Sequence, residues 1–267
     1  MIRFDKDVVK SLVIASENSF KLLFKNNYEE FYYCSLIMSE NATPYITAWS
    51  EEALKRLLLK KTIDEKDYLV KRRLYRWSYA DSPYCAYGFN DFFQNVDKLF
   101  IERFNHCLSN DDYERECQLW VNSMEEAMRI LDYNGMFGTG TIRKKILINA
   151  EIMPPVKSNI DRAKRLNPKE TFDEWLNFTQ QDEVIEIDYY SIWHPKLCNV
   201  VLVEKVNDQK VMIKLKKIFY YNDSLKTLIE GCKTPPFVLK ENALYDSVLE
   251  TLKNNQEIRK IIKIEVK

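Results

Sequence analysis

The sequence has little of what the familiar catalytic and metal-binding motifs require. Its 267 residues include 5 glycines and 2 histidines, and no Gly-x-Ser-x-Gly, His-Glu-x-x-His or Gly-x-x-x-x-Gly-Lys-Ser/Thr motif occurs. His106 has no second histidine or cysteine at the three- or four-residue spacing of a helix face, and His194 stands before Pro195 in a predicted turn. We therefore predict no catalytic residue, no metal site and no cofactor.

Cysteine is present, but without a spacing that indicates disulfides or metal. No C-x-x-C pair occurs, and the residues around the cysteines are typical of half-buried helices and strands. Free cysteine packs as a small hydrophobe, and the cytosol keeps it reduced. We expect six reduced thiols that pack within the fold: Cys34, Cys85, Cys107, Cys117, Cys198 and Cys232.

Long apolar runs and an excess of either charge are also missing. The first apolar stretch is interrupted by Lys10 and ends by Glu17, whereas a secretory signal needs roughly 7–15 uninterrupted apolar residues and a membrane span about 20. The 40 basic and 40 acidic side chains cancel, and proteins that bind duplex nucleic acid usually show a basic excess, at least in one domain. We expect a cytoplasmic protein with no membrane segment and no bulk nucleic-acid binding, a local basic patch remaining open.

The composition does provide material for a core, since apolar residues make up 46% of the chain and aromatic residues 13%. A disordered chain has the opposite balance. Helical periodicity predicts helices over residues 5–26, 51–61, 89–106 and 110–133. Patterns of β-prone residues predict a hairpin of 31–39 with 44–49 and a strand near 142–148, while 63–87 is irregular.

The remainder of the chain begins with Pro154-Pro155 and a polar stretch that looks like a connector, because a proline pair cannot continue a strand ladder. Strands are predicted at 184–190, 200–206 and 210–219, and helices near 223–231 and 241–253. We predict an α+β fold in which mixed or antiparallel sheets are flanked by helices. Its two units are residues 1–153 and a smaller unit at 181–267, joined by a connector at 154–180.

Two conspicuous clusters have ordinary explanations. The glycines of 135–140 follow a helix and precede a strand, which is the reverse of a phosphate-binding loop, so they predict a helix end and a tight connection. The acidic residues of 182–188 and the lysines of 210–216 alternate with apolar residues. Cross-strand charge pairing on a solvated sheet face explains both runs.

The most unusual stretch is 74–87, which holds five aromatic residues and one arginine. It is either a loop that packs over the sheet or a surface that binds a partner, since Trp, Tyr and Arg dominate interface energetics. Because an arginine flanked by aromatic residues is costly to bury, we expect Trp77 to point inward and Arg76 and Tyr84 to point outward. The candidate binding residues are Arg76, Trp77, Tyr79, Asp81 and Tyr84.

The order of features along the chain supports a relationship. It runs from Glu-Glu-Phe-Tyr-Tyr-Cys-Ser-Leu through Tyr75-Arg76-Trp77-Ser78 and Gly135-Met136-Phe137-Gly138 to Arg165-Leu166-Asn167-Pro168. Over roughly residues 1–175 this order resembles a bacterial family known as domain of unknown function 4303. The family has no established activity, so the resemblance implies a fold unit. Residues 176–267 resemble nothing that we recognise.

These observations favour a cytoplasmic, non-enzymatic module that binds a protein partner. By analogy with other small α+β proteins, it could be an immunity protein that neutralises a bacterial toxin, or another component of bacterial conflict. The alternative is an enzyme of unknown reaction with a pocket near the Tyr-Arg-Trp-Ser block. An enzyme would show convergent polar groups in an apolar pocket.

Overall fold

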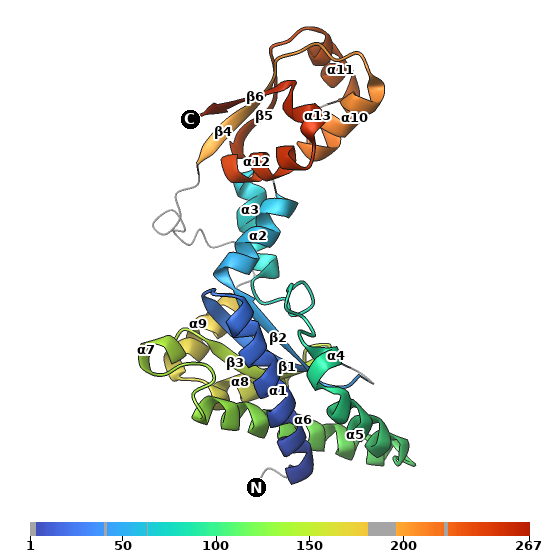
Figure 1. Ribbon diagram of the computed structural model, residues 1–267, viewed down its shortest axis with the longest axis vertical. Helices are drawn as coiled ribbons and strands as arrows, with labels where there is room; N and C mark the ends of the chain where they lie inside the picture. Colours follow the sequence, from blue (N-terminus) through green and yellow to red (C-terminus); the bar gives the residue numbers. More distant parts are fainter. Residues whose placement is uncertain (1–3, 40–41, 63, 181–195, 222–223) are drawn as a thin grey trace. The chain divides into compact units, whose positions relative to one another are not determined.

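The computed structural model describes residues 4–39, 42–62, 64–180, 196–221 and 224–267 (Figure 1). The chain divides into two compact units. Unit 1 comprises residues 1–54 and 75–183, and unit 2 comprises residues 55–74 and 184–267. The predicted α+β class is confirmed, with one mixed and one antiparallel three-stranded sheet among the described residues. No helix in these ranges is long and apolar enough to cross a membrane.

The elements of unit 1 include the two longest helices of the described chain and a small sheet. In chain order they are α1 (Lys6–Asn26), β1 (Phe31–Ser39), β2 (Tyr45–Ser50), the start of α2 (Glu51–Lys61), the end of α3 (Glu65–Tyr75), α4 (Phe89–Phe92), α5 (Gln94–Asn105), α6 (Asn110–Tyr133), α7 (Gly140–Arg143), β3 (Leu147–Met153), α8 (Lys157–Leu166) and α9 (Lys169–Gln180).

The two long helices begin and end where the sequence provides caps. The Asp5 carboxylate accepts hydrogen bonds from the first backbone N–H groups of α1, and the Ser109 hydroxyl accepts one from the Asp112 N–H at 3.2 Å at the start of α6. Gly135 follows α6 with φ +79°, a conformation that glycine adopts without strain. The glycines of 135–140 therefore form the predicted connection, which contains the single turn of α7 before β3.

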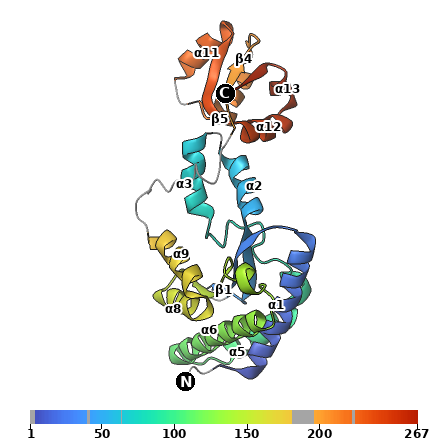
Figure 2. The ribbon, with the colours of Figure 1, turned by 90° about the vertical axis from the view of Figure 1, so that its left-hand side faces the viewer.

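The sheet of unit 1 has the order β2-β1-β3, with β1 antiparallel to β2 and parallel to β3. The predicted hairpin is confirmed. One face of the sheet is apolar and fully buried, as Cys34, Leu36, Ile46 and Ile148 show. Helix α1 lies on one side of β1, and α8 and α9 lie on the other (Figure 2). The helices thus bury both faces of a sheet that is only three strands wide.

Strand β3 is the edge of this sheet, and side chains that follow it satisfy its outward backbone groups. The Asn159 amide bonds to both the N–H and the C=O of Ile152, each at 3.0 Å. The Asn167 amide does the same at Ile148, at 2.8 and 2.6 Å. Between them, the Arg162 guanidinium donates to the carbonyl of Ala150. The three polar side chains take the place of a fourth strand.

The structure divides the chain differently from the predicted boundaries. Residues 154–180 are no connector: they hold α8 and α9, and α8 packs on β3. Polar residues such as Asn159 and Arg162 made this stretch look solvated, yet both are buried because they bond to β3. Residues 55–74 belong to unit 2, and the predicted irregular stretch 63–87 contains α3.

Unit 2 is an antiparallel sheet of order β5-β4-β6 with helices around it. Its core consists of apolar side chains such as Val200, Leu215, Leu239 and Val248. Besides most of α2 and α3, the described elements are β4 (Leu197–Leu202), α10 (Gln209–Ile218), α11 (Leu225–Lys233), β5 (Phe237–Leu244), α12 (Tyr245–Lys253), α13 (Gln256–Arg259) and β6 (Ile262–Val266).

One predicted strand of unit 2 is wrong. The stretch lies in helix α10 (Gln209–Ile218) and its C-cap residue Phe219, and the buried side chains Met212, Leu215 and Phe219 follow steps of three and four residues. Asp208 caps its first turn by accepting the N–H of Lys210 at 2.7 Å. The predicted cross-strand pairing of its lysines with the acidic residues of 182–188 is therefore wrong, because the lysines lie on a helix. The predicted strand at 184–190 lies outside the described residues.

All six cysteines are free thiols.

Candidate functional site

The second face of the unit 1 sheet carries polar side chains. Register places Ser35 between Thr47 on β2 and Asn149 on β3, and all three are fully buried. Glu151, two residues further along β3, shares this face and is 8% exposed. A buried polar face needs partners for each of its groups. Its partners come from the sheet itself and from the chain that covers it.

Residues 75–87, here called the Trp77 segment, are fastened along β2. The Trp49 indole donates to the Ser78 carbonyl at 2.8 Å, and the Thr47 hydroxyl donates to the Tyr79 carbonyl at 3.2 Å. The Ser82 hydroxyl donates to the carbonyl of Ala48. These bonds hold an otherwise irregular stretch in one conformation, so the Trp77 segment is a structural cover of the sheet.

Trp77 points inward, as predicted. Its ring makes edge-to-face contacts with Tyr32, Tyr33 and Phe178, at centroid distances of 5.2, 5.8 and 6.0 Å. Asp81, another candidate, accepts the hydroxyl hydrogen of Ser78 at 2.6 Å within the same segment. The structure thus joins Trp77 to strand β1 and to helix α9.

The expected outward orientation of Arg76 and Tyr84 is wrong. The Arg76 side chain is 13% exposed, lies 4.2 Å above the Tyr32 ring and forms an ion pair with Glu51 at 2.6 Å. Tyr84 is 5% exposed, and its hydroxyl donates to Glu29 at 2.6 Å. Nearby carboxylates offset the cost of burying these groups. The five candidates Arg76, Trp77, Tyr79, Asp81 and Tyr84 lie on one segment, but at least two of them are used internally.

Beneath this cover, Glu151 forms the centre of a buried network. The Tyr33 hydroxyl donates to its carboxylate, and the Ser35 hydroxyl donates to the same oxygen at 2.9 Å. Burial raises the pKa of Glu151, against the hydrogen bonds and the positive charge of Arg162, which lower it. Burial also raises the pKa of Tyr33. The network can hold a proton on Glu151 at a higher pH than an exposed carboxyl can.

Replacing Glu151 with glutamine should make unfolding less dependent on pH. The folded-state pKa of Glu151 lies above its unfolded value, so its stabilising contribution is complete below the unfolded pKa and is lost as the pH rises through the folded pKa. We therefore expect the free energy of unfolding of Glu151→Gln minus that of the natural chain to increase from pH 5 to pH 8, which means that the variant becomes relatively more stable. Urea unfolding at several pH values measures this difference. A constant difference across the range would contradict the raised pKa.

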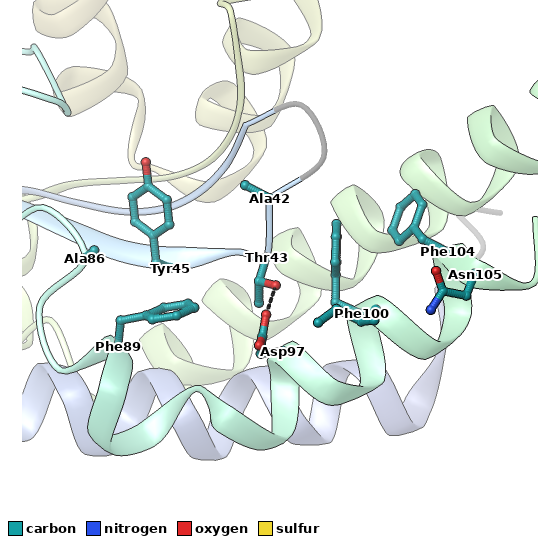
Figure 3. Close-up of a pocket in the computed structure, with 10 residues that line it drawn as sticks. Ala42, Thr43, Tyr45, Ala86, Phe89, Asp97, Phe100, Phe104 and Asn105 are labelled. Atoms are coloured by element: carbon teal, nitrogen blue, oxygen red, sulfur yellow. Dashed lines mark hydrogen bonds between the residues drawn. The ribbon is translucent and has the colours of Figure 1, made fainter.

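A separate cavity of about 530 Å³ opens beside β2, α4 and α5 (Figure 3). Aromatic rings form much of its wall, and the Phe100 and Phe104 rings lie 4.3 Å apart. Asp97 is its one charged lining residue, and the Thr43 hydroxyl donates to this carboxylate. The described lining is Ala42, Thr43, Tyr45, Ala86, Phe89, Asp97, Phe100, Ile101, Phe104 and Asn105. Such a site suits an apolar group that carries a positive charge or a hydrogen-bond donor.

The pocket was not predicted from the sequence, although residues 89–106 were expected to form a helix rich in aromatic residues. The signal was the pair Phe100 and Phe104, four residues apart on one helix face, next to Ile101, which is 51% exposed. What brings Thr43 and Tyr45 to the same place is the hairpin, which periodicity cannot position. Among the described residues, no group of three or more His, Cys, Asp or Glu is arranged to hold a metal ion.

Comparison with known proteins gives one result. The family model described as domain of unknown function (DUF4303) matches residues 13–168. No curated protein and no solved structure matches significantly. The matched residues include β1–β3, the Trp77 segment, the aromatic pocket lined by Phe100 and Phe104, and the asparagines that close the edge of β3.

Proposed function

The chain belongs to the DUF4303 family, and from the pocket of unit 1 we propose that it is a cytoplasmic, non-enzymatic module that binds a basic protein partner. The observation that carries this proposal is the open aromatic pocket with Asp97 as its charged lining residue. Buried aromatic and aliphatic anchors supply most of the energy of protein interfaces. A partner would insert an apolar side chain among Phe89, Phe100 and Phe104.

The charge of unit 1 supports a basic partner. Residues 1–54 and 75–183 contain 26 aspartates and glutamates and 18 lysines and arginines, a net charge of −8. An acidic surface accelerates association with a cationic partner and disfavours acidic competitors. The specific role we propose is that of an immunity protein that neutralises a basic bacterial toxin, for which an acidic unit would be suited. The free thiols agree with a reducing, cytoplasmic location.

Two isoleucines of unit 1 provide a matched test of the pocket. Ile101 lines it and is 51% exposed, whereas Ile14 lies on α1 outside the pocket lining and is 52% exposed. Ile101→Asp should weaken partner binding by about 2 kcal/mol or more, roughly 30-fold, because it puts a charge into an apolar contact. Ile14→Asp should bind as the natural chain does. Both should retain the natural melting temperature.

The partner can be identified by the same pair of variants. The natural chain, Ile14→Asp and Ile101→Asp serve as parallel baits in extracts of the source cells. The partner is a protein that the first two recover and the third does not. If it is a toxin, co-production of the natural chain should restore growth and Ile101→Asp should not. Equal recovery by all three baits would refute the pocket as the binding site.

One observation favours the enzyme alternative. Glu151 is a buried carboxyl with a raised pKa, and such groups concentrate in active sites. Its partners Tyr33, Ser35 and Arg162 are equally consistent with a structural network. If Glu151 is catalytic, Glu151→Gln should abolish the biological activity of the chain while leaving binding of the partner intact. If the binding proposal is right, it should leave both unchanged.

A further inference from the structure

The charges of the chain are separated between its two units. Unit 2, residues 55–74 and 184–267, contains 22 lysines and arginines and 14 aspartates and glutamates, a net charge of +8. Unit 1 carries the opposite net charge, so the neutral total of the whole chain hides a basic unit. The largest local excess is in residues 55–74, with 8 basic and 3 acidic side chains. The expectation of no bulk nucleic-acid binding rested on the total and does not apply to unit 2 alone.

Helix α10 displays part of this charge in a fixed direction. Its Met212, Leu215 and Phe219 side chains are buried in the core of unit 2, so the opposite side of the helix faces solvent. Lys210 and Lys217, seven residues and about two turns apart, are exposed on it. Exposed basic residues also occur on other elements of the unit, among them Lys55, Lys60, Lys226, Lys233, Arg259, Lys260 and Lys263.

We infer that unit 2 binds nucleic acid through the phosphate backbone, a function beyond the protein binding proposed for unit 1. Lysines on several elements suit a long polyanion, because each neutralised phosphate releases a counterion and adds to the affinity. Tyr220, 47% exposed, is the one aromatic side chain among the large exposed apolar residues described in unit 2. Base stacking, which needs aromatic platforms, is therefore a minor contribution, and binding should have little sequence preference.

An anionic membrane is the competing polyanion, and the apolar surface of the unit argues against it. A membrane-surface helix needs a continuous apolar face opposite its charges. On α10 the apolar side chains that would form such a face are in the core, and Ile213 is the large hydrophobic residue exposed to solvent. Elsewhere in the described part of the unit, the exposed Val238 and Val266 lie on separate strands, and Val70 and Leu74, four residues apart on α3, form a strip of only two side chains.

The test measures binding of the full chain to a short labelled duplex DNA of random sequence by fluorescence anisotropy. The affinity should fall steeply between about 50 and 200 mM salt, with a slope of about −0.9 per phosphate contact in log K against log salt. The double variant Lys210→Glu/Lys217→Glu should bind at least about tenfold more weakly. Its salt slope should be smaller by about 2, because two contacts are lost.

The matched control is Lys10→Glu/Lys98→Glu, which changes the net charge equally at two exposed lysines of unit 1. It should keep the natural affinity and slope. If circular dichroism shows that Lys210→Glu/Lys217→Glu is unfolded, Lys210→Gln/Lys217→Gln replaces it. About half the loss of DNA affinity is then expected. Absence of saturable binding at low salt, or equal losses in the α10 variant and the control, would overturn the inference. Stronger binding to phosphatidylserine vesicles than to DNA, sensitive to the same lysines, would overturn it in favour of a membrane.

Discussion

Replacing Trp49 with alanine is expected to lower the free energy of unfolding by about 3–5 kcal/mol, because it removes a large side chain that nothing refills. Trp49 is fully buried on β2, and its indole N–H is the donor to the Ser78 carbonyl. The substitution therefore creates a cavity and also releases the Trp77 segment from the sheet. Chemical denaturation followed by circular dichroism measures the loss.

Trp49→Phe separates the two effects. It keeps most of the ring volume but removes the hydrogen bond to Ser78, so we expect a smaller loss, of about 1–3 kcal/mol. Proteolysis of the native variants should show new cleavage within 75–87 in both cases. If Trp49→Ala unfolds with nearly natural stability, the Trp77 segment does not depend on this anchor.

Replacing Arg162 with methionine should also cost about 3–5 kcal/mol, because it strips donors from buried acceptors and a cation from the neighbourhood of a buried carboxyl. Arg162 is 3% exposed and bonds to the Ala150 carbonyl and the side chains of Ser158 and Asn159. Burial lowers its pKa to about 10, while the nearby carboxylates of Glu125 and Glu151 act in the opposite direction. Methionine fills the space but makes none of these bonds.

The loss should depend on pH and on Glu151. Without the guanidinium, the pKa of Glu151 should rise further, so the destabilisation should be larger at pH 8 than at pH 5. In the double variant Arg162→Met/Glu151→Gln the cost should be less than the sum of the two single costs. Simple additivity, or a loss that is equal at both pH values, would show that the two residues are not coupled.

Local signals were sufficient to predict α1, α6 and the β1–β2 hairpin. Asp5 and Ser109 are helix caps, and between each cap and the end of its helix the apolar residues recur at the 3.6-residue spacing of an α-helix. The prediction of a strand at 210–219 failed for a physical reason. In this short run Leu215 belongs both to a set of apolar residues spaced by two and to a set spaced by three and four. Periodicity alone cannot distinguish a helix from a strand there.

Tertiary partners account for the rest of what the sequence did not predict. Arg76 is costly to bury without Glu51, and Tyr84 needs Glu29 for its hydroxyl, but neither carboxylate is near its partner in the sequence. The pocket depends on how the hairpin is placed against α5. The family match and the α+β class could be predicted because they rest on local order, whereas the orientation of the candidate residues could not.

The asparagines at the edge of β3 have a consequence for how this protein meets other molecules. An open strand edge is a template on which another extended chain can add, either as a bound peptide or as the first step of aggregation. Asn159, Arg162 and Asn167 occupy the outward backbone groups of Ile148, Ala150 and Ile152. A ligand cannot add as a strand at this edge without displacing α8. A partner of unit 1, as proposed above, would therefore have to be recognised through side chains rather than by backbone pairing at this edge. The same closure protects a sheet of three strands from growing by self-association through β3.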